Sequence, residues 1–432
     1  MRCYNVLTSL GYHTFDIFLR LTFEEAMGLF KAFQKYEDVR IRPIGKDEKK
    51  AYALPKGYIV EYISKNKGIT WYVRFNDKLS AIMERYPKND EEPTPYSVRA
   101  KINPKILIGI RDYLTAANSN YLEDVESQFN IEAARISPIL RKFEHYSMNR
   151  TDYCLNADLV ELKIGCSSKQ MMVLIKRGNI PKHFTEWTEY NDKSHRKEAN
   201  KDAFYLHNDS LTINCYLKHE QLLSVFPNCP DLENSRNLIR FEVQCKYPKI
   251  YSLAKNNRYN SKLYKSMSDD ELFNEIQYGQ IITNPIDVIL SDAVAFDIVR
   301  KYFRRVIGYG DYYSLDVAKK RILSVNCHHK VQDRLIETLI LVNRCRSIAK
   351  AKATLHGENL EIFKRSLKHL GGIGINPVTI PREWGIPHIP NLFDAYERII
   401  EDEQYEIKLK EMHAEIMKNC DKKKSKKKKS KR

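Results

Sequence analysis

The chain has 432 residues, of which 43% are hydrophobic and 11% aromatic, and its formal net charge is +17. This length suits two domains or three, and the apolar content is sufficient for a sizeable core. The charge favours a nucleic acid as partner over a class with no polyanionic ligand, although a basic protein that is merely soluble has the same composition.

The nine cysteines are scattered and none forms a Cys-x-x-Cys pair, which argues against a zinc finger. Such cysteine usage is typical of a reducing compartment. No signal peptide is visible, and the longest apolar stretch is too short to span a bilayer. We therefore expect a soluble, cytoplasmic protein with no membrane partner.

The first third of the chain alternates predicted strands with one well-marked helix. Residues 15–21, 58–63, 69–75 and 96–102 show the apolar–polar alternation of half-buried strands. Thr22 and Glu25 form a capping box, which predicts a helix to about residue 36. Residues 105–114 and 120–145 have helical spacing.

Three predicted strands in the middle of the chain carry polar faces. They are residues 149–155, 211–218 and 238–246, and residues 204–207 form a hairpin with the second of them. Ser167 and Gln170 make another capping box, for a helix to about residue 177, and residues 186–201 read as a polar linker. These units predict an α+β fold, an antiparallel sheet with flanking helices on one face.

The pattern beyond residue 259 is helical. Residues 291–306, 315–324, 331–352 and 359–370 have apolar residues three or four apart, residues 371–390 hold four prolines, and residues 392–418 form a charged helix. The second and third of these helices would suit a helix-turn-helix, but helical packing explains them as well. The Lys-rich tail contributes +8 of the charge; it would add salt-sensitive DNA affinity or serve solubility alone. The sequence thus predicts three parts. They are an α+β domain at residues 10–255, a helical DNA-binding or assembly domain at 256–419, and a disordered tail at 420–432.

If the three polar strands share a sheet, one face gathers a tyrosine, two carboxylates and several cations. A tyrosine that attacks a phosphodiester needs a way to lose its proton, because a free phenol has a pKa of about 10. Two carboxylates are a minimal ligand pair for Mg²⁺ or Mn²⁺, which would polarise the phosphate. The gathered residues are Arg150 and Asp152, then Asn214, Tyr216 and Lys218, then Arg240, Glu242 and Gln244.

Three motifs, in this order and at about this separation, resemble the replication proteins of filamentous phages, the gene II/X family, which initiate rolling-circle replication. They are Arg150-Thr151-Asp152, Tyr216-Leu217-Lys218-His219 and Leu238-Ile239-Arg240-Phe241-Glu242. The segment from Ser97 to Lys105 also resembles a strand-to-helix part of that family. The resemblance covers residues 69 to 250 in patches and is weaker at residues 376–384.

The resemblance implies a nicking and joining endonuclease with a sheet core of the rolling-circle initiator (HUH-like) type. Tyr216 would be the nucleophile that stays joined to a 5′ phosphate, and Asp152 and Glu242 fall on the family's carboxylate positions. We expect those two carboxylates to hold the metal and Lys218 to assist catalysis. The family has a glutamate five residues after the tyrosine, where this chain has Gln221. Glu220, His207 and His219 are the other candidates to complete the metal site.

Cationic and aromatic residues are candidates for DNA contacts. Arg150 and Arg240 each precede a carboxylate by two residues, so an ion pair is as good a reading as a phosphate contact. Lys101 and Lys105 come from the segment that resembles the family. Trp71, Tyr72 and Tyr205 are candidates to stack on unpaired bases, although aromatic residues on strands are more often part of the core.

The partners expected are single-stranded or supercoiled origin DNA, a host helicase and a host DNA polymerase, because no Walker motif is present. Three alternatives stay open. The same chemistry would serve a plasmid mobilisation relaxase. A non-enzymatic origin-binding replication protein, or an RNA-binding or structural basic protein, would carry the same charge without cleaving DNA.

Overall fold

The computed structural model describes residues 7–36, 38–43, 57–64, 67–76, 96–187, 189–191, 196–198, 200–255 and 286–402. The chain divides into two compact units, each treated by itself below. The first comprises residues 1–156 and 180–302, and the second comprises residues 157–179 and 303–432. The predicted tail at 420–432 and the end of the charged helix at 392–418 lie outside the described residues.

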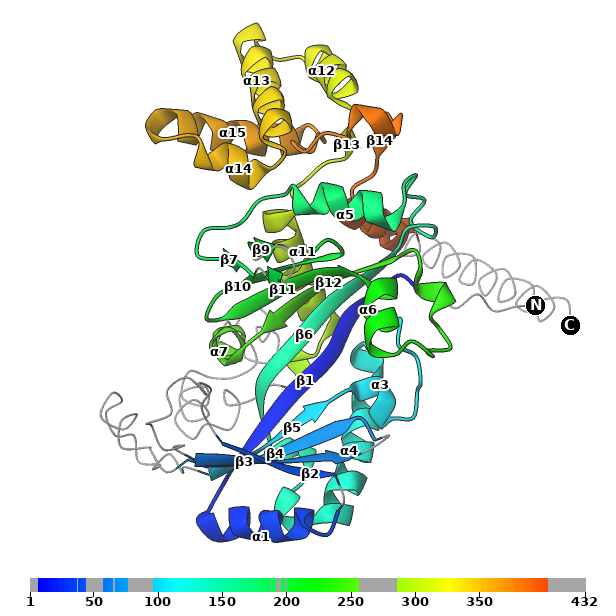
Figure 1. The fold of residues 1–432 in the computed structure, drawn as a ribbon, viewed down its shortest axis with the longest axis vertical. Coiled ribbons are helices and arrows are strands. Elements are labelled where there is room, and N and C mark those ends of the chain that lie inside the picture. Colours follow the sequence, from blue (N-terminus) through cyan, green and yellow to red (C-terminus); the bar gives the residue numbers. More distant parts are fainter. Residues whose placement is uncertain are drawn as a thin grey trace, which may run out of the picture. The chain divides into compact units, whose positions relative to one another are not determined.

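Ten strands of the described residues form one sheet, in the order β2-β3-β4-β5-β1-β6-β12-β11-β10-β7 (Figure 1). The pairings from β2 through to β6 and from β12 through to β7 are antiparallel. The predicted α+β class with a large antiparallel sheet is confirmed. The strands are β1 (Ser9–Leu21), β2 (Val39–Pro43), β3 (Gly57–Ser64), β4 (Ile69–Asn76), β5 (Tyr96–Ile102), β6 (Ser147–Asp158), β7 (Thr185–Glu186), β10 (Ala203–His207), β11 (Leu211–Leu217) and β12 (Leu238–Cys245).

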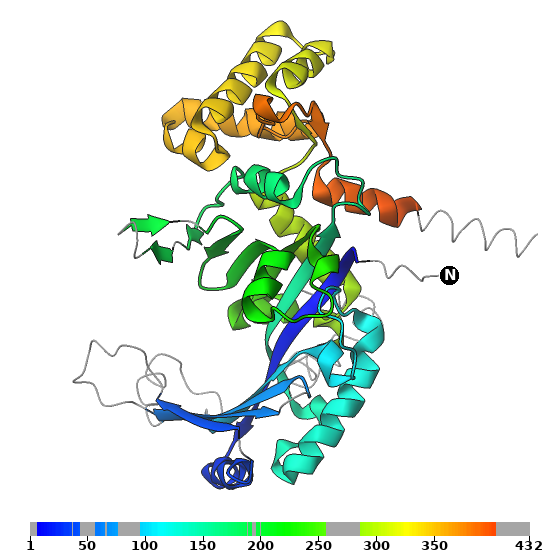
Figure 2. The same cartoon turned by 45° about the vertical axis from the view of Figure 1, so that its right-hand side comes forward.

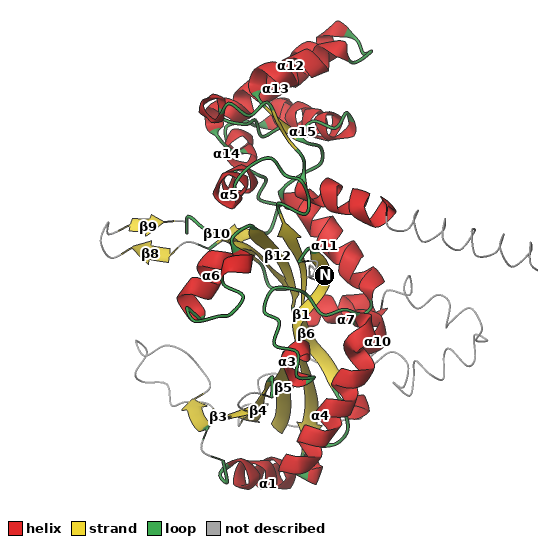
Figure 3. Ribbon diagram, turned by 90° about the vertical axis from the view of Figure 1, so that its right-hand side faces the viewer, coloured by secondary structure: helices red, strands yellow, loops and turns green. Residues whose placement is uncertain are grey.

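One face of this sheet is apolar and the other is polar. Phe15, Trp71 and Tyr153 are fully buried on the apolar face, where Trp71 packs against Phe129 and Tyr153 donates to the carbonyl of Ile289. Figure 3 shows α4, α10 and α11 along one side of the sheet. Trp71 is therefore a core residue, not a platform for a base. The helices of this unit are α1 (Phe23–Phe33), α3 (Pro104–Leu107), α4 (Leu122–Ile136), α6 (Lys218–Val225), α7 (Tyr247–Lys255), α10 (Ile286–Ile289) and α11 (Asp292–Val306), whose last turn belongs to the second unit.

Both predicted capping boxes are present, at Thr22 for α1 and at Ser167 for α5 (Ser168–Lys176). Two helix predictions in the first unit were too long. Residues 105–114 contain only the end of α3, since Gly109 has a φ of +83°. Residues 120–145 are helical only to Ile136, because Pro138 follows and begins a 3₁₀ turn. Short elements complete this unit: β8 (Glu189–Asn191), β9 (Arg196–Glu198), and the 3₁₀ turns Ser119–Tyr121, Pro138–Leu140, Phe143–His145 and Glu233–Ser235.

The second unit is mainly helical, and Figure 2 shows α12 to α15 of this unit in yellow to orange. Its core includes Ile322, Leu335, Leu339 and Leu370, all fully buried. The predicted helix at 331–352 is two helices, because Arg346 between them has a left-handed φ of 56°. The elements are α5, α12 (Leu315–Ser324), α13 (His329–Cys345), α14 (Ile348–Ala353), α15 (Gly357–Gly372), the pair β13 (Tyr312–Tyr313) and β14 (His388–Ile389), a 3₁₀ turn at Arg382–Trp384, and a helix that is described over 392–402.

A membrane-crossing helix was not expected from the sequence. In the part of the chain that the structure describes, no helix has the length and apolar character to cross a membrane.

Candidate active site

The strand order makes the three motif strands neighbours, because β6, β12 and β11 are consecutive in the sheet. In the β11–β12 ladder, Tyr216 lies opposite Arg240 and Asn214 lies opposite Glu242. Residues directly opposite each other, and residues two apart on one strand, share a sheet face. Asn214, Tyr216, Arg240 and Glu242 therefore share one face of the β11–β12 pair.

Tyr216 is held by a carboxylate. Its hydroxyl donates to Glu242 Oε1 at 2.8 Å. Burial and the negative charge of Glu242 raise the pKa of Tyr216 well above 10, and the positive charge of Arg240 only partly opposes them. The phenol is thus protonated at neutral pH, and it already points its proton at a group that can accept it.

Arg240 is a fully buried cation beside Tyr216 and Glu242. Its guanidinium donates to Asn156 Oδ1 and to the carbonyl oxygens of Leu114, at 3.1 Å, and Tyr113, at 3.3 Å. Its Nη1 lies 3.7 Å from Glu242 Oε1 and has no hydrogen-bond partner among the described residues. With none of its side chain exposed, Arg240 stabilises charge inside the site and offers no surface to DNA in this arrangement.

Asp152 is also neutralised by an arginine. Arg150 donates to Asp152 with Nε at 2.9 Å and with Nη2 to the second oxygen, and Thr14 on β1 donates to that oxygen as well. Arg150 keeps 23% of its side chain exposed, so one edge of its guanidinium reaches the surface. Asp16 lies beside it on β1, and burial raises the pKa of Asp16 although Arg150 and Arg99 lie within 4 Å.

Lys218 does not lie on the strand as predicted. β11 ends at Leu217, and Lys218 is the first residue of α6. It is nonetheless buried, with Nζ donating to Gln221 Oε1 at 2.9 Å. Burial, together with the positive charge of Arg240, lowers the pKa of Lys218 to about 7. A lysine with such a pKa can exchange a proton near neutrality.

His13 is a site residue that the sequence reasoning missed. It lies at an irregularity in β1, where the pairing with β6 shifts between Tyr12 and Thr14. Burial lowers its pKa well below 6.5, and the charges of Arg240 and Lys218 lower it further. The imidazole is therefore neutral among cations. A register shift of this kind leaves no mark in the alternation pattern, so the sequence contained no signal for it.

Lys101 and Lys105, the two lysines expected to contact DNA, have different environments. Lys105 is buried and pairs with Asp112 and Thr115. Hydrogen bonds from Lys105 and Thr115 lower the pKa of Asp112 to about 2 despite its partial burial. Lys101 is half-buried on β5 and lies opposite Asp16. Lys105, Lys218 and His13 line a common cavity of about 200 Å³.

The other candidates for the site are engaged elsewhere or stand apart. Gln221 accepts from Lys218, and the ring of His219 faces the carbonyl of Leu232 at 3.0 Å and Ser235. Glu220 is half-buried in the first turn of α6. His207 packs its ring 5.9 Å from that of Trp187, and its Nδ1 is buried without a hydrogen-bond partner among the described residues.

A divalent metal does not fit the side chains as they are arranged. Nowhere in the described ranges do three His, Cys, Asp or Glu groups come together closely enough to hold an ion. Both oxygens of Asp152 accept from Arg150, and Glu242 accepts from Tyr216. A metal that used these two carboxylates would have to displace those contacts.

Comparisons with known proteins give little. No protein-family model matches the chain, and no curated protein matches it. Among solved structures, the chain is similar to a rolling circle replication initiator protein from Geobacillus stearothermophilus, with 11% identity and a TM-score of 0.28. The match covers 69% of this chain and 85% of that one. A superposition this loose carries no argument about what the present chain does.

Proposed function

We propose that the chain is a rolling-circle replication initiator, a nuclease of the HUH-like type that nicks and rejoins one DNA strand through Tyr216. The observation that carries the proposal is the 2.8 Å hydrogen bond from Tyr216 to Glu242 beside a buried arginine. Tyr216, Glu242 and Arg240 thus supply a nucleophile, a proton acceptor and a fixed positive charge in one place. The family-like motifs at these same residues support the assignment to DNA.

The forward step follows from these groups. Tyr216 Oη attacks the phosphorus while its proton passes to Glu242 Oε1, and the developing phenolate is stabilised by Arg240. The bond between phosphorus and the 3′ oxygen breaks, and the 3′ oxygen leaves as a hydroxyl after taking a proton from Lys218. A 5′-phosphotyrosine and a primer end remain. The reverse of these steps rejoins the strand without ATP, because the phosphotyrosine keeps the energy of the broken bond.

Phosphate binding falls to the partly exposed cations of the sheet. Arg150 has an exposed edge beside the site, and Lys101 is half-buried on the nearby strand β5. Lys105 would act through Asp112 instead of touching DNA, since it is buried in that ion pair. The sequence also predicts Mg²⁺ or Mn²⁺ with Asp152 and Glu242 as ligands, and such an ion would first have to displace Arg150 and Tyr216 from these carboxylates. When bound, the ion would polarise the phosphate.

The remaining parts of the proposal concern partners and place. The substrate would be single-stranded or supercoiled origin DNA in a bacterial cytoplasm, with unwinding and synthesis by a host helicase and polymerase. The mainly helical second unit would support DNA binding or assembly. A plasmid mobilisation relaxase would use the same residues, so the choice between the two depends on the DNA site that is cleaved.

The test is a covalent-adduct assay. The protein is incubated with labelled single-stranded DNA from its own replicon, with Mn²⁺ or with EDTA, and run on a denaturing gel. We expect a labelled adduct that survives boiling and disappears in Tyr216→Phe but persists in the control Tyr247→Phe, an exposed tyrosine on α7. DNA binding with no adduct or nick on any strand would instead favour the non-enzymatic origin-binding protein.

A further inference from the structure

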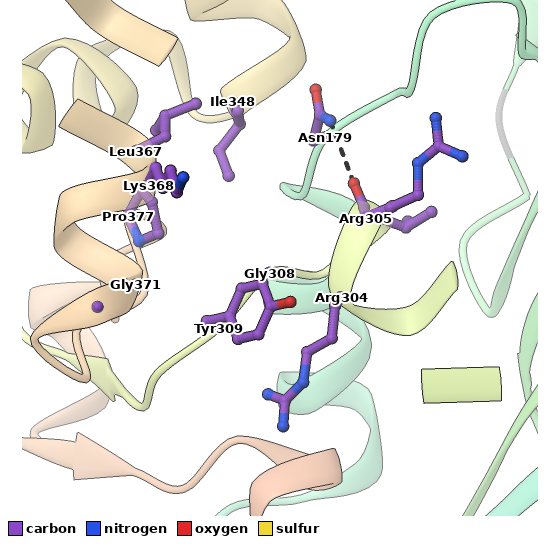
Figure 4. Close-up of a pocket in the computed structure, with 12 residues that line it drawn as sticks. Asn179, Arg304, Arg305, Gly308, Tyr309, Ile348, Leu367, Lys368, Gly371 and Pro377 are labelled. Atoms are coloured by element: carbon purple, nitrogen blue, oxygen red, sulfur yellow. Dashed lines mark hydrogen bonds between the residues drawn. The ribbon is translucent and has the colours of Figure 1, made fainter. Parts of the chain in front are cut away.

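The second unit holds a cavity of about 420 Å³ that the nicking chemistry does not use. This volume falls in the range of about 300–1,000 Å³ that is usual for small-ligand sites. In Figure 4, Leu367, Lys368 and Pro377 lie on one side, Asn179 lies on the other, and Tyr309 lies between them. Ile348 and Val306 complete an apolar lining.

Tyr309 is unusual because an exposed aromatic ring is held on a rigid loop. Tyr309 is 54% exposed. The glycines on either side, Gly308 and Gly310, have φ values of +96° and +78°, and a Cβ on Gly310 would lie 2.4 Å from the backbone of Gly374. Only glycine permits this path of the chain.

Two buried asparagines fix the same loop. Asn391 Nδ2 donates to the carbonyl of Gly310 at 3.2 Å, and Asn376 Nδ2 donates to that of Ile307 at 3.0 Å. Their side chains are at most 1% exposed. A tyrosine displayed on a surface by such a fixed backbone loses little conformational entropy when a flat ligand packs against it.

The charges around the cavity distinguish one lysine. The guanidinium of Arg304 lies 4.8 Å from the centre of the Tyr309 ring, but it is neutralised by Asp394 and Glu397. Lys364 on α15 is paired with Glu361. Lys368, one turn further along the same helix and exposed, makes no ion pair with any described residue. Lys368 is therefore available to bind an anion at the cavity.

We propose that this cavity binds a nucleotide of single-stranded DNA, with the base against Tyr309 and the apolar wall, and a phosphate at Lys368. An exposed ring next to a lysine is the combination that recognises single strands without regard to sequence, because every base has a flat face. Bases of a duplex are already stacked and paired, so the site selects single strands. The proposal rests on the proposed function only for the choice of DNA as ligand.

The test uses the full-length chain carrying Tyr216→Phe, so that binding is measured without cleavage. Anisotropy of a labelled single-stranded oligonucleotide gives the affinity. We expect Tyr309→Ala to weaken binding by about 5- to 100-fold, as loss of one stacked base does, and Tyr309→Phe to keep most of it. Lys368→Gln should reduce the salt dependence of binding, whereas its matched control Lys364→Gln should not.

A second readout covers the case in which Tyr309→Ala fails to fold. In Tyr309→Trp, the introduced indole should be quenched on addition of single-stranded DNA and not on addition of the same sequence as a duplex. Unchanged affinity in a folded Tyr309→Ala, equal losses for single strand and duplex, or no quenching would each overturn the proposal. An absent covalent adduct in the Tyr216 protein would overturn the proposed function but leave this site standing if binding still depends on Tyr309.

Discussion

Tyr216 donates its hydroxyl proton to Glu242 although the two residues are not opposite each other in the sheet. Tyr216 faces Arg240 across the β11–β12 ladder, and Glu242 faces Asn214. The contact is therefore a diagonal one, between residues offset by two positions on neighbouring strands, which long side chains can span. This offset places the carboxylate at the tip of the phenol and the arginine beside both.

Glu242→Gln tests the proton acceptor. The amide keeps the size of the side chain but cannot take the phenol's proton, so we expect nicking to slow by roughly 100-fold or more. Affinity for uncleaved DNA should change little. Single-turnover rates measure the effect, and Glu233→Gln, an exposed glutamate paired with Arg236, is the control. If Glu242→Gln nicks DNA at the full rate, another group accepts the proton of Tyr216.

Lys218 predicts a pH dependence of catalysis. Its pKa of about 7 means that the protonated form, which gives a proton to the leaving oxygen, is depleted as the pH rises. The nicking rate should fall above about pH 7 in the wild type, while Lys218→Met should be slow and lack this limb of the profile. Lys364→Met is a matched lysine control. A falling limb that persists unchanged in Lys218→Met would show that another group controls it.

The same lysine predicts a pH dependence of stability. Its folded pKa is about 7 and its ordinary value is 10.5, so between these values the unfolded chain binds a proton that the folded chain does not. Stability should therefore rise with pH across this window. Lys218→Met should raise the melting temperature most below about pH 7, and the gain should shrink towards about pH 10. Melting curves at both ends of this pH window test the prediction. An equal gain in melting temperature at every pH would contradict the link between Lys218 protonation and stability.

Arg240→Met should destabilise the first unit by about 3–5 kcal/mol, because it leaves Glu242 and Asn156 buried without their cation. Urea unfolding followed by circular dichroism measures this change. Arg236→Met, at an exposed ion pair with Glu233, should shift the unfolding midpoint very little. If the two variants are equally stable, the buried guanidinium contributes no more than a surface charge.

The metal dependence of nicking can be tested by changing Arg150, which binds both oxygens of Asp152. Arg150 and a metal would compete for the same two oxygens. Arg150→Gln should therefore lower the Mn²⁺ concentration needed for half-maximal nicking, and Asp152→Asn should raise it. Titration after EDTA treatment gives both values. Nicking that proceeds in EDTA would remove the metal from the proposal.

Much of the fold was predictable because it depends on local rules. The alternation of apolar and polar residues located β1, β4, β5, β6, β11 and β12, and the two capping boxes at Thr22 and Ser167 located the starts of α1 and α5. β2 was missed. Periodicity alone could not place the break at Arg346, since it depends on one left-handed residue between two helices.

The candidate site was predictable in part for the same reason. Strand parity placed Tyr216, Arg240 and Glu242 on one face, but the hydrogen bond between Tyr216 and Glu242 depends on the register of two strands. Lys218 was assigned to a strand because the alternation does not show that β11 ends one residue earlier. His13 and the burial of Trp71 depend on distant segments that pack against them, which no local pattern records.

The trio of Tyr216, Glu242 and Arg240 has a consequence for how the site would respond to salt. The phenol is neutral, the carboxylate negative and the guanidinium positive, and moving one proton from the phenol to the carboxylate leaves their total charge at zero. Deprotonation of Tyr216 thus moves charge over only a few ångströms inside the protein, and no counterion enters or leaves. Ionic strength should control how much DNA is bound, and the rate of the bound complex should be nearly indifferent to it.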